Sequence, residues 1–188
     1  MALERIAAVL LAAGAGVRFG GGKLDAMLGD KRVGTWAWAT LAAFRWQASG
    51  IVVPDAVPAF ATESCAALIA NSDAASGMAS SIRHAVRFAE AAGADALLIA
   101  LADMPFVRAE TIAALILRHD GDDPDAVTAT LYPDGSAGAP SLFGCGCFDA
   151  LLAIEGDRGA GAYLVRRSVE TVEIDAAELR DIDRLADL

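Results

Sequence analysis

The residues best suited to chemistry lie in a glycine-rich segment that follows a short apolar run. Residues 14–23 read GAGVRFGGGK. Small residues let the backbone approach a phosphate chain closely, and successive N–H groups can bind its oxygens. Arg18 and Lys23 add positive charge to the same segment. Because Lys23 is not followed by Ser or Thr, this is not a Walker loop. The pattern favours a phosphate-binding site, and the alternative is a flexible turn in an alanine- and glycine-rich chain.

Two aspartates are candidates for holding a metal ion. Asp103 follows the apolar run 97–102 and precedes Met104-Pro105, and Asp157 lies within the segment EGDRGA. A carboxylate at the end of a buried strand is costly unless it meets a cation. Mg²⁺ is commonly bound by one or two carboxylates together with substrate phosphates. The alternatives are that Asp103 caps the following turn and that Asp157 caps the following helix.

Two further segments could shape a binding site. In residues 71–81, which read NSDAASGMASS, Gly77 would let the backbone meet a planar base, while Ser80 and Ser81 offer hydroxyl groups. Helix capping explains the two serines equally well. Residues 138–143 (GAPSLF) would on their own be interpreted as a turn that leads into a strand.

The elements that must position these residues alternate along the chain. Apolar runs predict strands, and apolar residues at helical spacing predict helices. The alternation predicts an α/β fold, a three-layer α/β/α sandwich around a mostly parallel, Rossmann-like sheet, formed by residues 1–188 as a single domain. A hairpin is expected around Asp134-Gly135, and Ser80 or Ser81 is expected to cap a helix. Ligands of such sheets bind beyond the carboxyl ends of the strands. The predicted strands are 6–12, 51–53, 96–102, 126–131 and 169–174, and the predicted helices are 35–46, 60–70, 80–92, 108–119, 148–154 and 160–167.

The overall composition excludes several classes of protein. With 15 basic and 25 acidic residues, the net charge of −10 argues against non-specific nucleic-acid binding. Two histidines and three cysteines make a disulfide scaffold or a structural zinc site improbable. The longest apolar stretch, residues 6–17, is shorter than the roughly 20 residues that span a bilayer. Glu4 and the glycine-rich segment argue against a signal peptide, so we expect a cytoplasmic protein with no membrane partner.

Several motifs together resemble those of one enzyme family. LAAGAGVRFGGGK is similar to the signature LAAG-x-(S/G)-x-R-x-G-x-x-K of the MobA/MocA-type nucleotidyltransferases. LADMP, GDRGA, the 71–81 segment, GAPSLF and the ending DIDRLADL resemble further motifs of this family, in the expected order over almost the whole chain. The chain departs from the family pattern at Gly161, where an arginine is common, and at Arg184 and Leu185, where threonine and proline are common.

The resemblance implies a fold of the nucleotide-diphospho-sugar transferase type and a set of site residues. Arg18 and Lys23 would be catalytic, Asp103 and Asp157 would bind Mg²⁺, and Gly138 and Pro140 would border the acceptor. The nucleotide would be bound by Leu11, Ala12, Ala13, Gly14, Gly16, Arg18, Lys23, Asn71, Gly77, Ser80 and Ser81.

The resemblance also implies a reaction. A nucleoside monophosphate would pass from a nucleoside triphosphate to a phosphate-bearing acceptor, with release of pyrophosphate. LAAG together with LADMP and GDRGA is more similar to the MocA branch than to the guanylyl MobA branch, which implies CTP and molybdopterin as substrates. Transfer of an adenylyl group is the alternative that stays open for the base. Because the second pKa of a phosphate monoester is about 6, the acceptor needs no general base.

Three other functions remain open from the sequence. A sugar-phosphate or alditol-phosphate nucleotidyltransferase would use the same loop chemistry. An NAD-binding oxidoreductase would explain the spacing of Gly14, Gly16 and Gly20, although the acidic residue that should bind the ribose is missing at the usual distance. A catalytically silent nucleotide- or cofactor-binding module would need only the binding residues.

Overall fold

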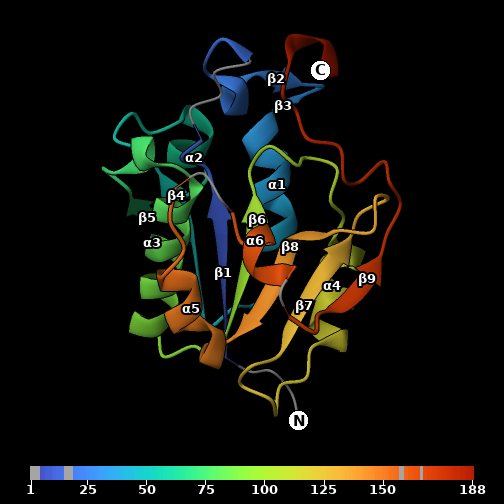
Figure 1. Ribbon diagram of the computed structural model, residues 1–188. Helices are drawn as coiled ribbons and strands as arrows, with labels where there is room; N and C mark the ends of the chain where they lie inside the picture. The colour runs from blue at the N-terminus through green and yellow to red at the C-terminus, as the bar shows by residue number, and fades with distance from the viewer. Residues whose placement is uncertain (1–4, 15–18, 157–158, 166) are drawn as a thin grey trace.

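A seven-stranded sheet forms the centre of the molecule in the computed structural model, which describes residues 5–14, 19–156, 159–165 and 167–188 (Figure 1). The strand order is β5-β4-β1-β6-β8-β7-β9. Among these strands, β8 runs antiparallel to both of its neighbours and the other pairs are parallel, which confirms the predicted mostly parallel α/β sheet. In chain order the strands are β1 (Ile6–Leu11), β4 (Ala48–Val53), β5 (Ala67–Ala70), β6 (Ala96–Leu101), β7 (Val127–Leu131), β8 (Ala137–Gly144) and β9 (Glu170–Glu173).

Helices cover both faces of this sheet and complete the three layers. One apolar core cluster includes residues of α1 (Val33–Ala42), α2 (Ala59–Glu63) and α4 (Ala109–Arg118). The cluster on the other face includes residues of α3 (Met78–Ala91), α5 (Phe148–Leu152) and α6 (Gly161–Leu164). Short 3-10 helices lie at 23–25, 74–76, 145–147 and 185–187.

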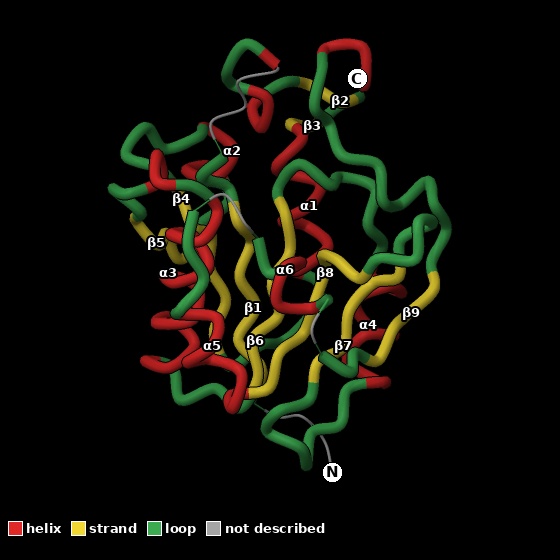
Figure 2. The backbone as a smooth tube through the Cα atoms, viewed as in Figure 1, coloured by secondary structure: helices red, strands yellow, loops and turns green. Residues whose placement is uncertain are grey.

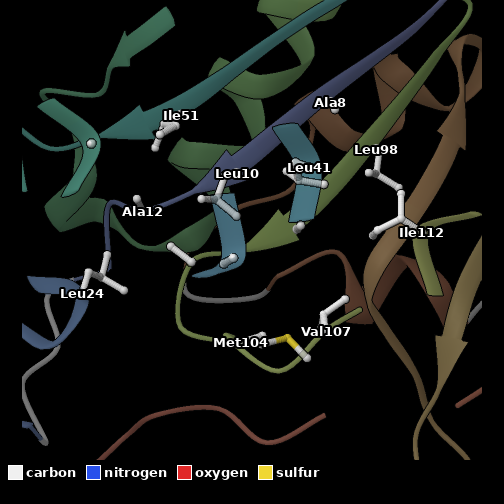
Figure 3. Packing of buried hydrophobic residues seen from close by; sticks show 14 of the residues in the cluster. Ala8, Leu10, Ala12, Leu24, Leu41, Ile51, Leu98, Met104, Val107 and Ile112 are labelled. Carbon is white, nitrogen blue, oxygen red and sulfur yellow. The ribbon is translucent and has the colours of Figure 1, made fainter. Parts of the chain in front are cut away.

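The first strand shows why the sequence forms a doubly covered sheet. Ala8 and Leu10 pack with Leu41 on one face (Figure 3). Ala7 and Val9 pack into the cluster on the other face. All six residues of β1 are buried, and none is polar. A strand that is covered on both sides therefore appears in the sequence as a continuous apolar run.

The prediction of one helix over residues 60–70 is wrong. α2 ends at Glu63, Cys65 takes a positive φ of 56°, and Ala67–Ala70 form the edge strand β5, parallel to β4. A Cβ on Gly50 would lie 2.8 Å from the Ala67 carbonyl oxygen, so the glycine permits the close approach of the two strands. Alanine and leucine favour a helix locally, and pairing with β4 overrides that preference.

Two other boundaries also differ from the prediction. The first long helix ends at Ala42 rather than at Trp46. α3 begins at Met78, with Gly77 (φ 102°) at its N-cap, so neither Ser80 nor Ser81 caps the helix. The expected hairpin is confirmed: β7 and β8 pair antiparallel across the Asp134-Gly135 turn.

The carboxyl ends of β1, β4 and β6 meet loops at one edge of the sheet, as Figure 2 shows in green. A small hairpin of β2 (Met27–Leu28) and β3 (Lys31–Arg32) and the C-terminal end of the chain also lie at this edge (Figure 1). None of the described helices has the length and apolar character needed to cross a membrane.

Candidate active site

Three neighbouring pockets that share lining residues lie along the carboxyl edge of the sheet, and we call them the three sections of a groove. The first section lies between the end of β1, residues 22–25 and the segment 54–58. It shares Ala13, Gly14, Ala74 and Ala75 with the second section, which also touches Gly77 and Ser81. The second section shares Leu11, Met78 and Leu101 with the third, which reaches Gly138 on β8. The groove therefore connects most of the described residues that the sequence marked for nucleotide and acceptor.

Lys23 and Asp103 lie together at this edge. Gly20, Gly21 and Gly22 all have positive φ values, and they turn the chain into the 3-10 helix Lys23–Asp25. The Lys23 ammonium donates a hydrogen bond to Asp103 Oδ2 at 2.6 Å, and its side chain is only 11% exposed. Burial acts to lower the pKa of Lys23, but the charge and hydrogen bonds of Asp103 and Asp183 outweigh burial and raise it.

The second partner of Lys23 is Asp183, a residue for which the sequence suggested no role. Asp183 Oδ1 lies 3.3 Å from the Lys23 ammonium. Asp181 belongs to the same acidic group, and its pKa is raised by partial burial and by the charges of Asp183 and Asp103. The two aspartates of the DID triplet near the chain end were the available signal.

The C-terminal segment is held in place by a buried carboxylate. Glu178 accepts hydrogen bonds from the Arg108 backbone N–H at 3.0 Å, the Arg108 Nε at 2.8 Å and the Thr111 hydroxyl at 2.6 Å. Burial would raise the pKa of Glu178, but these hydrogen bonds and the charge of Arg108 lower it overall. Farther along, the buried Ile182 donates its N–H to the Asp103 carbonyl oxygen at 2.8 Å. These contacts bring Asp183 to the end of β6.

Asn71 and Ser80 lie behind the wall of the groove rather than in its lining. Asn71 Nδ2 donates to the hydroxyls of Ser80 at 2.9 Å and Ser81 at 3.1 Å, and all three residues are buried. The Ser80 hydroxyl donates to the Gly77 carbonyl oxygen at 2.8 Å. This network fixes the loop that precedes α3, so that Gly77 and Ser81 face the second section.

The third section of the groove is mostly apolar. It is lined on one side by Tyr132 and Gly138, where a Cβ would lie 1.9 Å from the Tyr132 ring. The Tyr132 hydroxyl donates to the Ala139 carbonyl oxygen at 2.9 Å. Burial, and then the charges of Asp181, Asp103 and Asp134, raise the pKa of Tyr132 to about 12, so it stays protonated near neutral pH.

Pro140 does not line this section, contrary to the placement expected from the resemblance. It lies instead against a small internal pocket with residues of α1 and with Met104, and its carbonyl oxygen accepts a hydrogen bond from the Thr130 hydroxyl at 3.0 Å. In a regular strand, residues two apart such as Gly138 and Pro140 would point to the same face of the sheet. The pairing of β7 with β8 is irregular at this point, so the two residues face different pockets.

Gly16, Arg18 and Asp157 lie outside the described residues. Within the described ranges, no group of three or more His, Cys, Asp or Glu side chains could hold a metal ion. Asp103 and Asp183 nevertheless direct two carboxylate oxygens at one cationic atom, the Nζ of Lys23. Hard oxygen donors in this number suit Mg²⁺, which takes its remaining ligands from substrate phosphates and water.

Comparisons with known proteins agree with this architecture. The purine catabolism protein PucB of Bacillus subtilis is 32% identical over 115 residues, which cover 59% of this chain and 54% of PucB, so the match spans about half of that relative's length.

Three solved structures share the fold over almost the whole chain. A nucleotidyl transferase from Methanothermobacter (Mth528) has a TM-score of 0.81 at 20% identity, covering 98% of this chain and 94% of its own. The molybdopterin-guanine dinucleotide biosynthesis protein A from Archaeoglobus fulgidus has a TM-score of 0.73 at 20% identity, with coverage of 96% and 94%. A 4-diphosphocytidyl-2C-methyl-D-erythritol synthase has a TM-score of 0.72 at 20% identity, with coverage of 99% and 96%. The TM-scores establish the shared fold, and at 20% identity these matches establish the fold alone.

The family assignment rests on the sequence itself. The family model described as the MobA-like NTP transferase domain matches residues 8–172, which include both the glycine-rich segment and the aspartate that meets Lys23. The chain therefore belongs to the MobA-like NTP transferase family.

Proposed function

We propose that this enzyme transfers CMP from CTP to the phosphate of molybdopterin and releases pyrophosphate. The observation that carries the proposal is the row of three adjoining pockets, with Lys23 and its carboxylates in or beside the first and a mostly apolar pocket at the far end. The choice of CTP rests on the MocA-like motifs, and the choice of molybdopterin rests on them and on the pocket.

The chain's own residues would act mainly by binding and by charge. The backbone at Ala13 and Gly14 would accommodate the nucleotide, while Lys23 and Arg18 would stabilise the negative charge of the leaving pyrophosphate. The acceptor phosphate oxygen would attack the α-phosphorus as the bond to the β-phosphate oxygen breaks. This oxygen is already deprotonated near neutral pH, so no side chain has to remove a proton. Tyr132, which retains its proton, would serve as a wall of the acceptor pocket and not as a base.

A magnesium ion fits the donor set at the end of β6. Asp103 and Asp183 would hold it, with Asp157 as the further ligand that the family resemblance implies. When bound, Mg²⁺ would neutralise charge on the phosphates of the substrate.

The lining of the third section supports an acceptor with a flat ring system rather than a polyol. Leu11, Met78, Leu101 and Phe143 contribute apolar surface, and the Tyr132 ring can stack on a planar group. Few polar side chains are available there to bind the hydroxyls of a sugar or alditol phosphate, and Ser141 already donates to the Gly138 carbonyl oxygen.

Pyrophosphate release with matched substrate panels tests the proposal. We expect turnover with CTP and molybdopterin, and little with GTP, ATP or UTP. Turnover with an alditol phosphate or a sugar phosphate, but not with molybdopterin, would identify the alternative enzyme. Nucleotide binding without pyrophosphate release from any acceptor would indicate a binding module instead.

A further inference from the structure

Lysine is rare in this chain, and its placement is informative. Of the 15 basic residues, only Lys23 and Lys31 are lysines and the other 13 are arginines. Lys31 lies at the surface with its ammonium 4.4 Å from the centre of the Trp36 ring. Lys23, in contrast, is largely buried between carboxylates that are 80 and 160 residues away in sequence. A lysine ammonium is a compact point charge, whereas a guanidinium is a wide planar fork. The position between Asp103 and Asp183 thus holds the side chain that most resembles a small ion.

Within the part of the chain that the structure describes, the surroundings of the Lys23 ammonium are acidic. Asp103, Asp181 and Asp183 gather near it, in a molecule whose net charge is −10. The two closest carboxylates accept two of the three hydrogen bonds that the Lys23 ammonium can donate. Lys23 would bind phosphate oxygens most effectively if it turned away from the two carboxylates and toward the phosphates.

We propose that Lys23 acts as a stand-in for the divalent cation: it holds Asp103 and Asp183 together in the nucleotide-free enzyme, and it leaves them for the phosphates when the cation takes its place. The inference rests on the proposed metal-dependent function and adds a regulation to the same site. Lys23 and the cation would compete for the carboxylates while the nucleotide is absent. Once the nucleotide is present, Lys23 and the cation would act together, because Lys23 would bind phosphate oxygens while the cation binds the carboxylate oxygens.

Competition predicts that removal of the ammonium tightens metal binding. We expect Lys23→Met to bind Mn²⁺ about tenfold more tightly than the wild type in the absence of nucleotide, within the usual range of coupling between two ligands. Isothermal titration calorimetry and the electron paramagnetic resonance signal of free Mn²⁺ measure this affinity. The matched control is Lys31→Met, which removes the other lysine and should bind Mn²⁺ as the wild type does. Equal or weaker binding by Lys23→Met, or no binding by any of the three proteins, would overturn the proposal.

The wild-type protein provides an independent test that does not depend on how a variant folds. Labelling with [¹³Cε]lysine gives signals from only two side chains, and the ring current of Trp36 identifies that of Lys31. Titration with Mg²⁺ should shift and sharpen the Lys23 signal as its ion pairs open, and leave the Lys31 signal in place. A Lys23 signal that stays unchanged while calorimetry records binding of Mg²⁺ would contradict the exchange.

These measurements separate the inference from the proposed function, because both are made without nucleotide or acceptor. If the substrate panel fails while Lys23→Met gains Mn²⁺ affinity, the reaction is wrong and the exchange stands. If CTP and molybdopterin are turned over while Lys23→Met gains nothing, the reaction stands and the exchange is wrong.

Discussion

At the scale of the single residue, the proposed function assigns the most direct effect on turnover to the ion pair between Lys23 and Asp103. We expect Lys23→Ala and Asp103→Ala each to lower kcat by about 10² to 10³, since each removes a charge that would stabilise the transition state. Pyrophosphate release measures kcat, and thermal melts of the same samples check that both variants fold. Rates close to those of the wild type in both folded variants would refute the assigned roles.

Protonation of Glu178 should change the free energy of unfolding as the pH is lowered. Its pKa is lowered in the folded protein, so its contribution is complete above the ordinary glutamate pKa and disappears as the pH falls through the lowered value. Glu178→Gln should therefore lose about 1–3 kcal/mol of stability near neutral pH and show a shallower loss of stability under acid. Urea melts between pH 3 and 7 measure both effects. Glu173→Gln, at an exposed position on β9, is the control and should retain the wild-type pH profile.

At the scale of the element, Asp25 connects the segment that carries Lys23 to α2. Its carboxylate accepts hydrogen bonds from the backbone N–H groups of Ala59 at 2.9 Å and Phe60 at 2.8 Å. These are N–H groups of the first turn of α2, which have no partner within the helix. The Asp25 side chain thus caps α2 and holds the 3-10 helix Lys23–Asp25 against it, beside the first section of the groove.

Asp25→Ala should weaken this connection. We expect a loss of about 0.5–2 kcal/mol in the free energy of unfolding, together with a higher KM for the nucleotide, because Lys23 lies two residues away on the same 3-10 helix. Denaturant melts and steady-state kinetics measure the two quantities. Asp30→Ala, in the exposed turn between β2 and β3, is the matched control. A variant that loses stability but keeps the wild-type KM would show that Asp25 has no part in positioning Lys23.

At the scale of the whole molecule, the net charge of −10 opposes the approach of a nucleoside triphosphate. Salt screens this repulsion over distances beyond about 10 Å at 0.1 M ionic strength. We therefore expect the association rate constant of a fluorescent CTP analogue to rise as NaCl is increased at constant free Mg²⁺. Stopped-flow mixing measures this rate constant, and a fall with added salt would mean that a local positive field at the groove dominates the approach.

The sequence determined the layered α/β architecture, because a strand buried on both faces needs a continuous apolar run, as in β1 and β6. It also determined that Lys23 and Asp103 follow the apolar runs that form β1 and β6. Because these two strands are parallel, their carboxyl ends lie at the same edge of the sheet. Only the tertiary structure decided that Ala67–Ala70 pair as a strand, that Pro140 lies against a different pocket from Gly138, and that Asp183 reaches Lys23. Those outcomes depend on strand register and on contacts across up to 160 residues of chain, neither of which leaves a local pattern in the sequence.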